Sequence, residues 1–142
     1  MKYHFKIHKE GNQYWAECLE LKGCFTQGKN LEELHKNMGE ALNLYIEEPV
    51  DSKYLAPLPD KKIKKTKSIV EVALDSKIAL AFLIRRYRIK YKMTQEQAAK
   101  ALGFKNIYSY QRLESGKSNP TLEILLQLRK LFPSLSVDLV FS

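Results

Sequence analysis

The chain has 142 residues, enough for one domain of ordinary size or for two small ones. With 44% hydrophobic and 28% charged residues it has the composition of a soluble globular protein, and no apolar run approaches the roughly 18 residues of a membrane-spanning helix. The first stretch, MKYHFKIHKEGNQYW, lacks the continuous apolar core of a signal peptide. Two cysteines do not make a disulfide framework. We therefore expect a cytoplasmic protein with no membrane partner.

Charge is distributed unevenly along the chain. Residues 1–60 carry seven lysines against ten acidic residues, a net charge of −3, whereas residues 61–142 carry 17 basic residues against six acidic ones, a net charge of +11. A basic half favours a polyanionic partner, and an acidic half favours a different one, such as a basic protein. Selection for solubility alone can also produce such an imbalance.

The N-terminal residues predict three strands. Residues 3–8 alternate apolar and polar side chains, which is the pattern of a half-buried strand. Glu10-Gly11-Asn12 supplies a turn, and residues 13–19 are expected to form a second strand paired with the first. Residues 23–28 form a short segment bracketed by glycines. Together these segments predict a three-stranded antiparallel meander.

After the third strand, the apolar period changes from 2 to 3.6, which predicts a helix. Asn30 can cap its start, with Glu33 as the capping-box partner, and Glu48-Pro49 should end it. We expect this helix to lie across the small sheet and to bury its apolar face. That face holds Leu31, Leu34, Met38, Ala41, Leu42 and Tyr45.

Residues 49–68 are predicted to be a linker, because they hold three prolines and then the run KKIKKTK. Such a run is usually a solvated tether, although it can also contact phosphates. The β-branched residues 69–74 are a strand candidate that could return to the N-terminal sheet, serve the C-terminal part or pair at a dimer interface. We therefore expect two domains, residues 1–74 and 75–142.

The C-terminal part predicts a series of helices. A helix is expected from Ser76 to about Tyr91, and Thr94 is placed to cap a second helix over Gln95–Leu102. Ala98 and Ala99 are small enough for another helix to approach closely.

Gly103 then supplies a sharp turn before a third helix, from about Asn106 to Leu113, which ends near Gly116. A fourth helix is expected to start at Pro120-Thr121, and Ser136–Phe141 alternates like a terminal strand. The packing residues expected in the fourth helix are Leu122, Leu125, Leu126 and Leu128.

The exposed side of the third helix is rich in side chains that bind base edges and phosphates. Asn and Gln pair with adenine and Arg with guanine, while flanking lysines meet phosphates. A plain four-helix domain with a polar face would look similar. The predicted DNA-binding residues are Gln95, Lys105, Asn106, Tyr108, Ser109, Gln111, Arg112 and Lys117.

The pattern T-Q-x-x-A-A-x-x-L-G, followed by R-L-E-x-G-K-x-x-P, resembles the repressor-type helix-turn-helix of the Xre family. The segment between Leu102-Gly103 and Leu113-Glu114 is one residue longer than the usual pattern. The resemblance implies binding of operator double-stranded DNA by a homodimer or a higher even oligomer, with the third helix in the major groove.

The first 48 residues resemble the antitoxin family called HicB. The resemblance rests on the hairpin, the L-x-G-C-x-T-x-G turn at Leu21–Gly28, and the E-E-L…E-A-L…Y helix, followed by a repressor-like domain. Leu19-Glu20-Leu21 stands where the family often has a proline before the turn. The resemblance implies a partial ribonuclease H-like β-β-β-α-β fold and binding to a small, basic, HicA-like toxin that cleaves mRNA. The expected toxin contacts are Trp15, Glu17, Phe25, Glu32 and Glu33.

Catalysis by the first domain would require several carboxylates that converge on two metal ions. Glu17 and Glu20 lie on or beside one strand, and no arrangement in the sequence forces such a cluster. Cys18 and Cys24 fit no common zinc spacing and are expected to be buried as small apolar residues. We therefore predict no enzyme activity, no catalytic residue, no metal and no cofactor.

The sequence as a whole predicts an α+β protein, with a partial ribonuclease H-like β-β-β-α-β domain and an all-α helix-turn-helix domain that ends in a short strand. The predicted function is that of a type II antitoxin that binds its toxin and represses its own operon. A stand-alone transcriptional regulator with a small-molecule-sensing first domain is the main alternative. An RNA-processing enzyme is a third.

Overall fold

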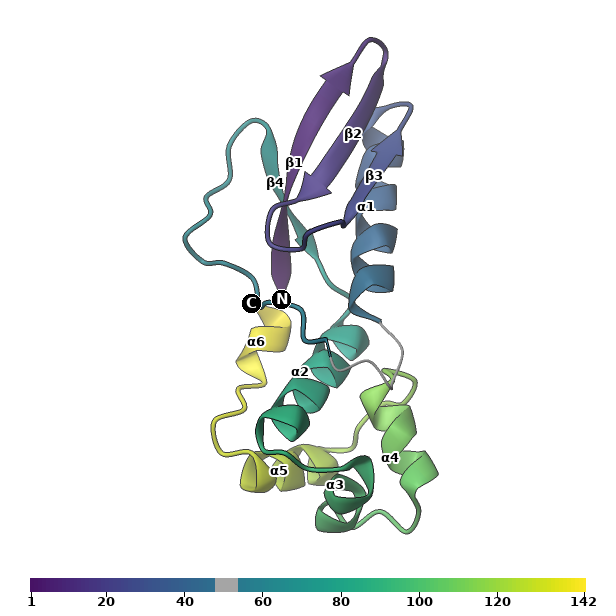
Figure 1. Cartoon of the computed structure of the whole chain (residues 1–142), viewed down its shortest axis with the longest axis vertical. Helices are drawn as coiled ribbons and strands as arrows, with labels where there is room; N and C mark the ends of the chain where they lie inside the picture. The colour runs from purple at the N-terminus through teal and green to yellow at the C-terminus, as the bar shows by residue number, and fades with distance from the viewer. Residues whose placement is uncertain (48–53) are drawn as a thin grey trace. The chain divides into compact units, whose positions relative to one another are not determined.

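A computed structural model describes residues 1–47 and 54–142, and the chain divides into two compact units, Met1–Asp75 and Ser76–Ser142. The first unit, here unit 1, has the element order β-β-β-α-β, and the second, unit 2, contains helices alone among its described elements. Figure 1 shows both units. The predicted α+β class is confirmed. The predicted domain boundary, between residues 74 and 75, lies one residue before the division.

Unit 1 is built on a four-stranded antiparallel sheet with the strand order β3-β2-β1-β4. The last strand pairs with the first, so that Lys2 is opposite Ala73 and Lys6 is opposite Ile69. Of the places left open for residues 69–74, the structure therefore selects the N-terminal sheet. The strands are β1 (Lys2–Glu10), β2 (Gln13–Cys18), β3 (Phe25–Gly28) and β4 (Ile69–Ala73).

Helix α1 (Leu31–Ile46) packs against one face of this sheet (Figure 1). Asn30 caps it as predicted, since its side chain accepts a hydrogen bond from the Glu33 amide at 2.8 Å. The Glu33 carboxylate, however, accepts from the amide of Lys29 at 2.6 Å, one residue earlier than a capping box requires. The fully buried face of the helix is narrower than expected and consists of Leu34, Met38, Leu42 and Ile46.

Gly28 allows the end of β3 to approach this helix. A Cβ atom at Gly28 would lie 2.6 Å from the backbone nitrogen of Leu34 and 2.8 Å from its Cα. Both atoms belong to the backbone and have little freedom to move. A side chain at this position would therefore push β3 away from α1.

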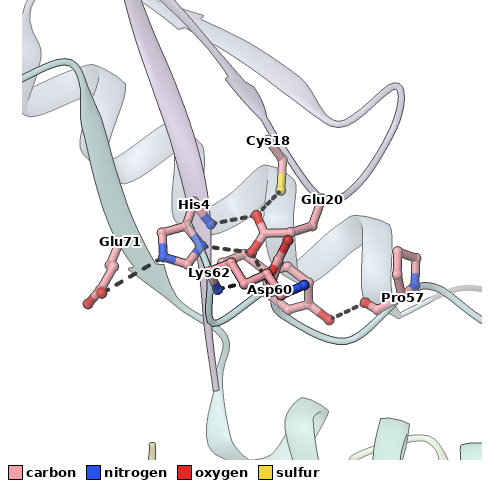
Figure 2. A network of polar contacts seen from close by, with 8 residues as sticks. His4, Cys18, Glu20, Pro57, Asp60, Lys62 and Glu71 are labelled. Carbon is pink, nitrogen blue, oxygen red and sulfur yellow. Dashed lines mark hydrogen bonds and ion pairs between the residues drawn. The ribbon is translucent and has the colours of Figure 1, made fainter. Parts of the chain in front are cut away.

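The segment from Tyr54 to Lys67 is not the free tether that the prolines and lysines suggested. The Tyr3 hydroxyl donates to the Pro57 carbonyl at 2.9 Å, and the Asp60 amide donates to the Glu20 carboxylate at 3.2 Å. Ala56 is buried. Figure 2 shows Asp60 and His4 beside Glu20, which also accepts from the backbone amide and the ring Nδ1 of His4. Residues 49–53 of the predicted linker, with the predicted Glu48-Pro49 helix end, lie outside the described residues.

Unit 2 confirms the predicted run of helices and turns. Thr94 forms a full capping box with Gln97, and Gly103 takes a left-handed backbone conformation at φ +79° directly after the second helix of the unit. No helix in the described part of the chain is long and apolar enough to cross a membrane. The helices are α2 (Ser76–Lys90), α3 (Gln95–Ala101), α4 (Ile107–Glu114), α5 (Leu122–Leu131) and α6 (Asp138–Phe141).

Two predictions for the C-terminal end were wrong. Residues 136–141 do not form the predicted strand; they contain the short helix α6 (Asp138–Phe141). The amides here donate three residues back, from Leu139 to Ser136 and from Val140 to Val137, because no strand of unit 2 offers a partner among the described residues. The packing role predicted for Leu122 and Leu126 is also wrong within this chain, since their side chains are 74% and 55% exposed. Leu128 is fully buried, as expected.

Candidate functional site

The helix-turn-helix of unit 2 consists of α3, a tight turn and α4. Ala98 and Ala99 are buried, which lets α4 approach α3 closely. The turn is closed by a hydrogen bond from the Phe104 amide to the Ala99 carbonyl at 2.9 Å, and the Phe104 ring meets the Tyr110 ring edge-on. The fixed turn sets the direction in which α4 presents its outer side chains.

A buried ion pair fastens α4 to α2. The Arg88 guanidinium donates two hydrogen bonds to the Glu114 carboxylate, at 2.9 and 2.8 Å, and a third to the Met93 carbonyl. The Tyr110 hydroxyl donates to the same carboxylate. Burial acts to lower the pKa of Arg88, but Glu114 outweighs it and the pKa rises; burial and Glu114 together raise the pKa of Tyr110. This network holds α4 from its inner side.

Two glutamines predicted to bind DNA extend from this network. Gln95 donates to the Glu114 carboxylate at 3.4 Å, and Gln111 donates to the Gln95 side-chain oxygen at 3.1 Å. Both glutamines are half-buried. This chain of contacts begins at the buried Glu114 carboxylate and orients the amide of Gln111 at the outer side of α4. Gln95 therefore has a positioning role in addition to any contact with DNA.

The other predicted DNA contacts fall into two groups. Tyr108, Arg112, Lys105 and Lys117 are exposed, and the Arg112 guanidinium is steadied by a hydrogen bond to the Lys117 carbonyl at 3.2 Å. Asn106, in contrast, is the N-cap of α4: its side-chain oxygen accepts from the amide and the hydroxyl of Ser109. That oxygen is thus engaged in the cap, and the two-bond pairing with adenine predicted for Asn106 would have to break it.

Sequence reasoning missed a hollow beside Arg112. Its volume is about 220 Å³, and it lies between α4 and the loop that leads into α5. Ser118 and Asn119 line it together with Arg112, which adds hydroxyl and amide groups of the kind that contact phosphates. The loop residues carry no helical pattern, and the S-N-P-T sequence before α5 is the signal that could have drawn attention to them.

On unit 1, α1 covers one face of the sheet. The opposite face is covered at His4, which is buried beside Glu20, and is open over β2 and β3. The side chains of Tyr3, Phe5 and Ala16 are fully buried, and strand alternation places their neighbours on the opposite side. Cross-strand register then brings three of the predicted partner contacts together on that open face, since Glu17 is opposite Phe25 and Trp15 is opposite Gln27.

These three residues line one hollow. Trp15, Glu17 and Phe25 surround it with Glu10, Thr26 and Gln27, and its volume is about 650 Å³. The His8 ring stacks on the Trp15 indole at a centroid distance of 4.1 Å. Sequence reasoning missed His8 and Glu10 in this role, although the hairpin pairing of residues 8 and 15 follows from the turn at Gly11.

The two remaining predicted partner contacts do not join this hollow. Glu32 and Glu33 lie in the first turn of α1, on the helix that covers the other face of the sheet. The Glu33 carboxylate also accepts from the Lys29 amide, and the Glu33 amide donates to the side-chain oxygen of Asn30. The structure therefore separates the five predicted contacts into an aromatic and acidic sheet face and an acidic helix start.

Among the described residues, no group of three or more His, Cys, Asp or Glu side chains is arranged to hold a metal ion. Cys18 and Cys24 are both buried and free, as expected for small apolar residues. The contact between the two thiols raises the pKa of Cys18, an effect to which burial adds, and lowers the pKa of Cys24.

Comparison with known proteins supports the helix-turn-helix of unit 2. Residues 84–140 match a family model described as helix-turn-helix. The chain is 39% identical over 56 residues to an uncharacterized HTH-type transcriptional regulator from Archaeoglobus fulgidus, which covers 39% of this chain and 79% of that protein.

Two further relatives carry another name. The chain is 39% identical over 57 residues to the UPF0150 protein ssr1765 from Synechocystis, which covers 40% of this chain and 72% of that protein. It is 48% identical over 40 residues to a UPF0150 protein from Helicobacter pylori, covering 28% of this chain. The chain spans 56% of the length of the Helicobacter protein, a little more than half.

The buried network, the tight turn and the exposed polar side of α4 define a helix-turn-helix DNA-binding domain of the Xre type, and this class is the one that the family model matches. The extent of the Synechocystis match settles the family: the chain belongs to the UPF0150 proteins.

Proposed function

We propose that this protein is the antitoxin of a type II toxin–antitoxin pair and that unit 1 is a HicB-like domain. In this proposal, unit 1 binds and masks a small, basic, HicA-like toxin that cleaves mRNA. Unit 2 binds operator DNA and represses the operon that encodes both proteins. The observation that carries the proposal is the joining of a helix-turn-helix unit to a separate sheet unit with an open aromatic and acidic surface.

The charge of the two parts supports this division of labour. Residues 61–142 carry a net charge of +11, and exposed Lys105, Arg112 and Lys117 lie on or beside α4, where operator phosphates and bases would be met. Residues 1–60 carry −3, which favours encounter with a basic protein. A masking domain needs only to cover the toxin's RNA-binding surface, so this role needs no catalytic residue, and we propose none.

Operator binding by Xre-type domains calls for a twofold-symmetric protein, and the exposed side of α5 offers a surface for it. Leu122 and Leu126 lie one helical turn apart and are both largely exposed. We propose that a second copy of this chain covers them. Light scattering of Leu126→Lys should then report a monomer, whereas Glu123→Lys on the same helix should remain a dimer.

The proposed function is tested by looking for a small open reading frame beside its gene and co-expressing the two. We expect growth arrest when that frame is expressed alone, recovery when this chain is added, and co-purification of the two proteins. Arg112→Ala should weaken operator binding in a gel-shift assay and still restore growth, because the two activities belong to different units. Failure of the wild-type chain to restore growth, together with normal operator binding, would contradict the antitoxin role.

One observation favours a second candidate, a stand-alone regulator whose first domain senses a small molecule. The hollow on unit 1, at about 650 Å³, is within the range of small-ligand sites. In that case operator affinity would change with a metabolite and no neighbouring gene product would co-purify.

A further inference from the structure

The hollow on the open face of unit 1 has a chemistry that selects its occupant. Two of its walls are aromatic, Trp15 and Phe25, and two are carboxylates, Glu10 and Glu17. Phe25 is 68% exposed, so its ring is available to a ligand. None of the described residues that line the hollow is basic.

The orientation of the Trp15 ring in the hollow is fixed by neighbouring side chains. The His8 ring lies nearly parallel to the Trp15 indole, with an angle of 16° between the planes, and therefore occupies one of the two faces of the indole. The indole N–H donates to the Glu10 carboxylate at 3.2 Å. A ligand in the hollow thus meets the free side of an indole that is already oriented, at little further cost in side-chain entropy.

The two carboxylates are held by the same pair of rings. Glu10 accepts from Trp15, and a Glu17 carboxylate oxygen lies 3.3 Å from the Nε2 atom of His8. Each carboxylate keeps an oxygen that no ring contacts, so each can accept from a ligand. Two negative groups beside two aromatic faces attract a cation and repel an anion, and an uncharged apolar ligand would bury the carboxylates without compensation.

We propose that this hollow binds an arginine side chain presented by a basic protein partner. The planar guanidinium can stack on the aromatic rings while its N–H groups donate to Glu10 and Glu17, a combination that the compact ammonium of lysine does not match. Only the identity of the partner, the toxin, rests on the proposed function. The occupant's chemistry follows from the hollow itself.

Lys6 provides an internal check on this assignment. It is opposite Glu17 in the register of β1 and β2, on the same open face, yet Glu17 forms its contact with His8 instead. Because Lys6 is opposite Glu17 in the strand pairing, its ammonium could compete with a ligand for the Glu17 carboxylate. Lys6→Ala should strengthen arginine binding, whereas Lys36→Ala on α1 should leave it unchanged.

Trp15 is the only tryptophan of the chain, so its fluorescence reports on the hollow directly. The full chain is titrated with the peptide acetyl-Gly-Arg-Gly-amide and, as an uncharged isostere, with the same peptide containing citrulline. We expect a saturable change with arginine and binding about tenfold weaker with citrulline. Glu17→Gln and Phe25→Ala should each weaken arginine binding. The matched control Glu40→Gln, which removes one charge on α1, should not.

Equal binding of the arginine and citrulline peptides would overturn the proposal, as would equal arginine binding by Glu17→Gln and the wild type. Because Phe25 is exposed, Phe25→Ala leaves the core intact, and its circular dichroism spectrum confirms folding. In cells, a Glu17→Gln, Phe25→Ala double variant that restores growth as well as the wild type would overturn the arginine site and leave the antitoxin role standing. A wild-type chain that binds the arginine peptide but restores no growth would do the reverse.

Discussion

Each unit of this protein contains a buried carboxylate that joins two of its segments, and the two carboxylates have different partners. Glu114 in unit 2 is paired with the permanent charge of Arg88 and also receives the Tyr110 hydroxyl. Glu20 in unit 1 receives two backbone amides, those of His4 and Asp60, and the ring of His4. The first arrangement joins helix to helix within a core, and the second fastens a loop to a sheet.

This difference determines what each carboxylate supports. Glu114 lies beneath α4, so the loss of its charge leaves Arg88 buried without a partner and disturbs the surface proposed to bind DNA. Glu20 holds the segment around Asp60. Detachment of this segment would leave the strand pairing of the sheet in place. Substitution of Glu114 therefore tests the global stability of unit 2, and substitution of Glu20 tests the local attachment of one segment in unit 1.

The largest effect is expected for Glu114→Ala. Removing one partner of a buried ion pair costs about 3–5 kcal/mol, because the remaining charge is uncompensated. Unit 2 should unfold at a much lower urea concentration than in the wild type, while the sheet of unit 1 persists, and amide exchange measured by mass spectrometry can resolve the two. Glu123→Ala, which removes an exposed acid from the start of α5, should cost less than about 1 kcal/mol. Similar urea midpoints for the two variants would show that the ion pair does not hold α4.

A smaller and local effect is expected for Glu20→Ala. The lost hydrogen bonds are worth about 1–3 kcal/mol, and their loss should free the segment around Asp60 rather than unfold the sheet. Because that segment contains five lysines between residues 61 and 67, trypsin should cut it faster than in the wild type. Glu40→Ala serves as the control with an equal change in charge. An unchanged cleavage rate in Glu20→Ala would mean that contacts such as Tyr3 to Pro57 suffice to hold the segment.

The two units also differ in how much of their structure could be predicted from the sequence. In unit 2 the caps at Thr94 and Thr121 and the turn at Gly103 are local signals, and the helix positions followed from them. The terminal helix was mistaken for a strand because an alternating pattern of six residues does not reveal whether a neighbouring strand exists.

In unit 1 the strands were foretold by their alternation, but the hollow on the open face was not. Trp15, Glu17 and Phe25 line one hollow only because β3 pairs with β2 in one register, and that register is not set by a tight turn between the two strands. The attachment of residues 54–67 escaped prediction because its key partner, Glu20, is 40 residues away from Asp60.

Operator recognition offers a sharper comparison of exposed and engaged side chains on α4. Arg112→Ala should cost about 1–3 kcal/mol at a single base position and relax specificity there, since its exposed guanidinium is suited to guanine. Lys117→Ala should weaken binding to all sequences alike and reduce the salt dependence by about one charge. Binding to a panel of single-base operator variants separates the two. A uniform loss for Arg112→Ala would reassign it to the phosphate backbone.

The smallest effect expected is at Asn106, where the sequence indicated a base contact and the structure shows a helix cap. Asn106→Ala should lower the free energy of unfolding by about 1 kcal/mol, because the Ser109 amide loses its acceptor. Asn106→Ser keeps a capping oxygen and removes the amide that would pair with adenine. We therefore expect the serine variant to match the wild type in both stability and operator affinity, as measured by urea unfolding and gel shift. A serine variant that is stable but binds the operator several-fold more weakly would show that Asn106 leaves its cap to contact DNA.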